Sequence, residues 1–241
     1  MKQNFKQERV DLAAAFRWAA RLNMHEAVAN HFSLAVSIDG SQFLLNPIGA
    51  HFSQICASDL LVIDSNNADT MSQPNAPDPT AWAIHGAMHR NNPHARCILH
   101  VHSKYATILS ALEDKTMKPI DQNTMRFYEK VSIDYDFDGM GVGDEAERLS
   151  TLLGDNSVLL MGNHGVLTAA DSVAQAFDDL FYFERACETL IEAYQTGKKL
   201  HLASHEVAKK TAKQWERYDA SELHFQALKT ILDKEEPDYK N

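Results

Sequence analysis

Apolar positions along the chain follow either a helical repeat or short continuous runs. The helical repeat, in which apolar residues recur every three or four positions, predicts helices over residues 7–23, 80–90, 103–112, 144–153 and 171–194, with a more polar helical region over 204–233. The short runs predict strands over residues 32–38, 42–45, 60–63, 97–101, 131–135, 158–161 and 166–168. Strands and helices alternate in the second half, which is typical of a layered α/β domain with a mixed central sheet.

Turn and cap residues mark several boundaries between these elements. Asp39-Gly40 predicts a turn between two strands, and Thr80 is expected to cap the helix that follows the Asn- and Pro-rich loop 66–79. Gly154 is expected to end the helix before it. The Glu-Glu-Pro stretch at residues 235–237 predicts a disordered tail.

Length and composition favour one domain in a reducing compartment. The 241 residues are 44% hydrophobic and contain no linker-like stretch, so we expect one domain over residues 1–241 with a helical extension from about residue 200. No apolar run is long enough for a membrane span, and the polar N-terminus is unlike a signal peptide. Three widely spaced cysteines favour the cytoplasm. The net charge of −10 and the lack of a basic cluster argue against nucleic-acid binding.

Histidines at the ends of two predicted strands indicate a metal site. His100-Val101-His102 ends one apolar run, and Asn163-His164-Gly165 follows another. Because side chains alternate along a strand, His100 and His102 point to the same side. With His164 they would form a triad for a divalent metal. The alternative is that all three are hydrogen-bonded core histidines, and their shared pattern favours the metal.

Several short motifs occur in order over about residues 16–193. They are Asn30-His31-Phe32-Ser33, Asn46-Pro47-Ile48-Gly49, Ala57-Ser58-Asp59-Leu60, His100-Val101-His102-Ser103, Asn163-His164-Gly165-Val166 and Glu184-Arg185-Ala186-Cys187. Together these motifs resemble the class II aldolase/adducin family. The resemblance implies a three-layer α/β/α fold around a mixed sheet. It also implies a homotetramer with active sites at subunit interfaces and a small-molecule substrate.

The resemblance further implies that His100, His102 and His164 hold a divalent ion that polarises a carbonyl or enediolate. Zn²⁺ is the favoured ion, with Mn, Fe, Co and Ni as alternatives that three histidines also accept.

The chain departs from the family's sugar-phosphate aldolases at two places. The position of their acid/base Glu falls on Ala81, and Asp78 is either a substitute or a helix cap. By resemblance, a set of residues corresponds to the family's substrate and phosphate site, although most of its hydroxyl groups are missing. These residues are Asn30, Ser33, Asn46, Gly49 and Thr80. A non-phosphorylated substrate is therefore favoured.

Two residues are candidates for acid/base catalysis. Tyr135 matches a Tyr that family aldolases donate from a neighbouring subunit; the alternative is an interface aromatic. His31 titrates in the right range for general acid/base work; the alternative is a turn histidine that bonds the backbone. His85 is expected at an interface or in the core, and His89 as a surface or packing residue.

Two functions follow from these observations. The first is a metal-dependent carbon–carbon lyase, of aldolase or decarboxylase type. The missing Glu favours decarboxylation, because departure of CO₂ creates the carbanion and only a proton donor is then needed. The second is a non-catalytic, adducin-like binding or structural protein. The retained triad and the short acidic end, Asp233 to Asn241, favour the enzyme.

Overall fold

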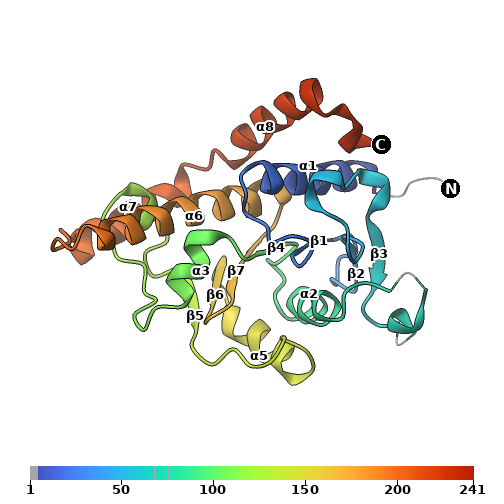
Figure 1. Cartoon of the computed structure of the whole chain (residues 1–241), viewed down its shortest axis with the longest axis horizontal. Helices are drawn as coiled ribbons and strands as arrows, with labels where there is room; N and C mark the ends of the chain where they lie inside the picture. Colours follow the sequence, from blue (N-terminus) through green and yellow to red (C-terminus); the bar gives the residue numbers. More distant parts are fainter. Residues whose placement is uncertain (1–4, 68, 75) are drawn as a thin grey trace.

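A mixed seven-stranded sheet lies between two layers of helices in the computed structural model, which describes residues 5–67, 69–74 and 76–241 (Figure 1). The strands lie in the order β3-β2-β1-β4-β7-β6-β5. Neighbours in this sheet are antiparallel, except for β5 and β6, which are parallel. This arrangement confirms the predicted three-layer α/β/α fold with a mixed sheet.

The strands are β1 (His31–Ala35), β2 (Gln42–Leu45), β3 (Leu61–Asp64), β4 (Cys97–Val101), β5 (Val131–Asp134), β6 (Val158–Met161) and β7 (Gly165–Ala170). The helices are α1 (Lys6–Arg21), α2 (Pro79–Asn91), α3 (Lys104–Ser110), α4 (Gln122–Arg126), α5 (Asp144–Leu153), α6 (Val173–Gln195), α7 (His205–Arg217) and α8 (Ser221–Glu235). Among the described residues, no helix has both the length and the apolar character that crossing a membrane requires.

The alternation of side chains along β4 assigns each residue to one of the two helical layers. Leu99 and Val101 pack in the larger core with α1 and α6, whereas Ile98 packs in a second core with α2 and α5. Figure 1 shows α1 and α6 on one side of the sheet and α2 and α5 on the other. His100 therefore projects from the sheet on the side of α2 and α5.

Strand pairing brings the motifs of the sequence together around β4. His31 of β1 lies opposite His100 in the antiparallel pair of β1 and β4. On the other side of β4, Val101 pairs with Val166 of β7, and His164 directly precedes β7. A Cβ atom at Gly165 would lie 2.5 Å from the Val101 carbonyl oxygen, so the close approach of the two strands requires glycine there.

The start of α2 corrects the expectation that Thr80 is the cap and confirms the helix-cap alternative for Asp78. Asp78, not Thr80, is the N-cap: its Oδ1 accepts hydrogen bonds from the backbone N–H groups of Thr80 at 2.8 Å and Ala81 at 3.1 Å. In the preceding predicted loop, residues 68 and 75 lie outside the described residues, and Thr70–Ser72 form a 3₁₀ turn.

The C-terminal segment corrects the predicted disordered tail. Arg17 of α1 is 5% exposed and donates to Glu236 at 3.1 Å and to Asp238 at 2.8 Å. Pro237–Lys240 form a 3₁₀ helix, and the Tyr239 side chain is fully buried. A buried guanidinium needs anionic partners, and these acidic residues provide them, so the segment is ordered against α1.

Candidate metal centre

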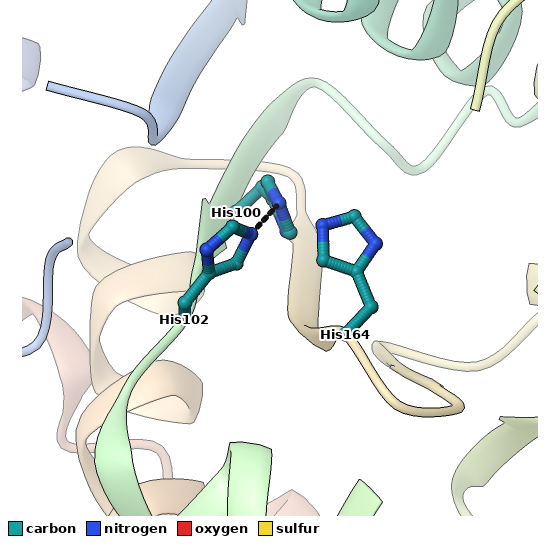
Figure 2. A group of neighbouring side chains, drawn as sticks. All are labelled: His100, His102 and His164. Carbon is teal, nitrogen blue, oxygen red and sulfur yellow. Dashed lines mark hydrogen bonds between the residues drawn. The ribbon is translucent and has the colours of Figure 1, made fainter. Parts of the chain in front are cut away.

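Three imidazole rings converge beside the end of β4 (Figure 2). His100 lies in β4, His102 directly follows it, and His164 comes from the turn between β6 and β7. One possible ligand nitrogen from each ring lies within 4.8 Å of the others, and the Nε2 atoms of His100 and His102 are 3.2 Å apart. Figure 2 shows a ring nitrogen of His164 directed toward the other two rings. The structure thus brings together the three histidines predicted as ligands.

Hydrogen bonds fix the orientation of two of these rings. His100 Nδ1 lies 3.0 Å from the Val166 carbonyl oxygen, and His102 Nδ1 lies 3.2 Å from a Glu26 carboxylate oxygen. A carbonyl and a carboxylate accept hydrogen bonds, so both Nδ1 atoms carry the proton. In the neutral ring each Nε2 then holds a free lone pair. His164 is held differently: its Nδ1 is buried without a hydrogen-bond partner among the described residues, and Phe137 packs on its ring at 4.2 Å.

The surroundings keep all three rings neutral. Burial, followed by the neighbouring histidines, lowers the pKa of His100 well below its usual value. Burial lowers the pKa of His102 as well, although Glu26 opposes this shift. Burial and His102 lower the pKa of His164 to about 4. Neutral imidazole is the form that binds metal ions.

The donor set fits a divalent ion. Two neutral rings that face each other with lone pairs 3.2 Å apart repel unless a cation lies between them. Ligands of a tetrahedral zinc ion, each about 2.0–2.1 Å from the metal, lie about 3.3 Å from one another. His100, His102 and His164 could therefore hold such an ion with little rearrangement.

Glu26 is not one of the three triad residues, but its carboxylate orients His102. The sequence did not indicate this role. The Asn30 Oδ1 atom accepts from the backbone N–H of Glu26 at 2.7 Å and from that of His102 at 3.4 Å. This bridge holds the Glu26 backbone beside the residue that its carboxylate orients. Asn30 is 2% exposed, and its Nδ2 is buried without a hydrogen-bond partner among the described residues. No local pattern marks Glu26, since only the fold brings it to His102.

Three of the residues predicted to contact substrate lie around β1, β2 and the start of α2. Asn46 joins backbone segments: its Oδ1 accepts from Phe32 N–H at 3.2 Å and its Nδ2 donates to the Asn30 carbonyl at 3.3 Å. The Thr80 hydroxyl donates to Asp78 at 2.5 Å. Gly49 is exposed with a φ of 77°. The polar side-chain atoms of Asn46 and Thr80 thus have partners within the protein.

A buried histidine chain (His31, His85, Ser33 and His89) lies between β1 and α2. His31 Nδ1 is 2.7 Å from His85 Nε2, and His85 Nδ1 contacts the Ser33 hydroxyl. Ser33 Oγ is 2.8 Å from His89 Nε2, and His89 Nδ1 is 2.6 Å from the Ala95 carbonyl oxygen. All four side chains are at most 4% exposed. These contacts bond the Ser33 hydroxyl within the protein, and its predicted contact with substrate stays a prediction.

The structure gives His85 and His89 partners that the sequence analysis did not assign. They are four residues apart on α2, and His31 and Ser33 are two apart on β1. Each pair therefore shares one face of its element, which is the signal that could have found the chain. The ring centroids of His31 and His100 are 4.8 Å apart, so the buried histidine chain ends beside the triad.

Two further positions from the sequence analysis, Ala81 and Tyr135, have different surroundings. Ala81 is buried in a small apolar cluster with Phe43 and Leu45, so no acid group occupies that position. Tyr135 directly follows the edge strand β5, is 56% exposed and lies 5.5 Å from the Lys115 ammonium group. Its role as a proton donor to a neighbouring subunit stays a prediction.

Comparisons with known proteins agree with this fold. The model of the family described as Class II Aldolase and Adducin N-terminal domain matches residues 10–191. An aldolase II superfamily protein from Pseudomonas syringae, known from its crystal structure, is 30% identical, with a TM-score of 0.89 over 100% of this chain and 98% of that one. The decarboxylase NovR of Streptomyces niveus is 27% identical over 225 residues, which cover 90% of this chain and 82% of the relative. L-fuculose 1-phosphate aldolase from Glaciozyma antarctica, 21% identical with a TM-score of 0.82 over 98% and 92% of the two chains, shares the fold. The chain therefore belongs to the class II aldolase and adducin N-terminal domain family.

Proposed function

We propose that this protein is a divalent-metal-dependent carbon–carbon lyase for a small, non-phosphorylated carbonyl or carboxylate compound. The observation that carries the proposal is the convergence of three neutral imidazoles, two of which have their Nδ1–H groups anchored so that their Nε2 lone pairs are free. A bound divalent ion, with zinc favoured, would polarise a substrate carbonyl.

Decarboxylation is favoured over aldol cleavage because of the residue at the start of α2. Retro-aldol cleavage needs a base to deprotonate a hydroxyl group, and the position where family aldolases carry Glu is the buried Ala81. In decarboxylation of a β-keto acid, the bond to the carboxylate breaks and its electron pair delocalises into the neighbouring carbonyl. CO₂ leaves, and one proton is added at the carbon. The relative named decarboxylase, similar over 90% of this chain, supports the same preference.

Residues around the triad are assigned the remaining roles. Tyr135, exposed beside an edge strand, is the proposed proton donor to a site in a neighbouring copy, and we propose the homotetramer with interfacial sites that the family resemblance implies. Phe137 forms an apolar wall against His164 and would exclude water from it. His31, packed beside His100, would contact the substrate or its proton.

Metal content and turnover test this proposal together. The protein is stripped with a chelator, reloaded with zinc or manganese, and incubated with panels of β-keto acids, hydroxy-aryl acids and aldols. We expect one bound ion per chain and release of CO₂ from at least one acid. The His102→Ala variant should lose the ion and the activity, and Tyr135→Phe should keep the ion and lose activity.

A metal-loaded protein that turns over none of these three classes of compound would overturn the lyase proposal. Protein that binds no metal, and whose stability is unchanged by chelation, would point instead to an adducin-like binding role.

A further inference from the structure

The buried histidine chain has a single arrangement of hydrogen-bond protons. At its inner end the Ala95 carbonyl can only accept, so His89 Nδ1 carries a proton. The Nε2 atom of a neutral His89 is then an acceptor, and the Ser33 hydroxyl must donate to it. Because Ser33 has one proton, its oxygen accepts from His85 Nδ1. His85 Nε2 is therefore an acceptor, and His31 Nδ1 donates to it.

This arrangement of protons requires all three imidazole rings to be neutral, and the burial of the rings keeps them neutral. The His31 side chain is 4% exposed and its Nδ1 is bonded to another imidazole instead of a carboxylate, so a charge on this ring would be costly. Burial lowers the pKa of His89 to about 4, and that of His85 well below the usual value. A reversed arrangement would leave the lone pairs of His89 Nε2 and Ser33 facing each other, since the carbonyl offers no proton.

We propose that the Ala95 carbonyl, acting through the buried histidine chain, holds His31 in the tautomer that is protonated at Nδ1 and unprotonated at Nε2. Ser33, His85 and His89 are then positioning residues, because they act on the metal centre only through His31.

The unprotonated nitrogen belongs to a ring that lies beside the triad. His31 is paired with His100 across β1 and β4, their rings are 4.8 Å apart, and its Nδ1 is turned toward α2. His31 therefore presents a lone pair on the triad side. In this tautomer the Nε2 atom accepts a hydrogen bond or a proton and cannot donate one, which leaves proton donation on the triad side to another group. The inference does not rest on the lyase proposal, because the tautomer is a property of the protein without substrate.

The tautomer is measured directly by magic-angle-spinning ¹⁵N NMR of zinc-loaded protein labelled at the histidine rings. Protonated and unprotonated ring nitrogens have well-separated shifts, and the His31→Gln variant identifies the His31 signals. In the wild-type protein we expect His31 Nδ1 in the protonated range and His31 Nε2 in the range of a nitrogen without a proton.

The Ser33→Ala variant tests the link through the chain. Without the hydroxyl, the buried His85 Nδ1–H has no acceptor, and an unpaired buried donor is costly. His85 should move its proton to Nε2 and donate to His31, so that the His31 Nε2 signal shifts into the protonated range. The Ser33→Thr variant keeps a hydroxyl and should restore the wild-type spectrum. Ser132→Ala, which removes a buried hydroxyl bonded to the Leu153 carbonyl, is the matched control and should change nothing at His31.

A proton on His31 Nε2 in the wild-type spectrum would overturn the proposal, whatever the variants do. An unchanged His31 tautomer in folded Ser33→Ala protein would show that the chain does not set it. Neither measurement needs turnover, so a failure here is distinct from a failure of the proposed lyase activity.

Discussion

Replacing Glu26 with alanine should weaken metal binding without disturbing the fold. The carboxylate accepts from His102 Nδ1 at 3.2 Å, and its backbone is held by Asn30. Loss of such a partner typically lowers metal affinity about 10–100-fold. The Glu26 side chain is 66% exposed, so water can replace part of its role. We therefore expect the lower end of that range, about tenfold or about 1.4 kcal/mol.

Zinc affinity at neutral pH, measured by competition with a chromogenic chelator, checks this expectation. The Glu26→Gln variant keeps an oxygen that accepts from His102 and should stay close to wild type, which separates hydrogen bonding from charge. Glu206→Ala removes another exposed glutamate, at the start of α7, and serves as the control. If Glu26→Ala binds zinc as tightly as the wild type, then Glu26 does not orient His102 and our account of the anchored ring is wrong.

Three further predictions concern the approach of β4 and β7, the burial of His89 and the order of the C-terminal segment. Gly165→Ala would place a Cβ 2.5 Å from the Val101 carbonyl oxygen, so it should lower the melting temperature and weaken zinc binding, and an unchanged protein would refute the close approach. Burial holds the folded-state pKa of His89 at about 4, below its ordinary 6.5, so the unfolded chain binds more protons between these values. The contribution of His89 to the free energy of unfolding should therefore be complete above pH 6.5 and fall by up to about 3 kcal/mol as the pH drops toward 4. Urea unfolding of the wild type and of His89→Gln at several pH values measures this contribution, and the same dependence of the unfolding free energy on pH in both proteins would contradict it. Arg17→Met should release the C-terminal segment, seen as faster proteolysis after α8, because Asp238 loses its partner.

Local patterns predicted the elements that carry the metal site. The bounds of β4, α5 and β6 agree with those expected from periodicity and from Gly154, because an uninterrupted apolar run or a helical stripe is a property of neighbouring residues. Alternation along β4 placed His100 and His102 on one side, and the apolar run before His164 placed that residue at the end of another strand. These interpretations needed no knowledge of which elements pack together.

Contacts between distant elements could not be predicted in this way. The bond from Glu26 to His102 and the ion pair from Arg17 to Asp238 join positions 76 and 221 residues apart. The predicted tail was wrong because its composition is polar, while its order comes from a buried arginine on another helix. Hydrophobic periodicity predicts which face of a helix or strand is buried, but it does not predict which other element packs against that face.

Strand alternation and short motifs encode the family, the layered fold and the three converging histidines, because these are properties of residues close together in the chain. How those histidines are held depends on the packing of distant elements. The tertiary structure packs α2 on β1, so that His85 and His89 meet His31 and Ser33, and it brings Glu26 to His102. The physical reason is that a ring's tautomer depends on the partner of its other nitrogen, and that partner comes from a different element.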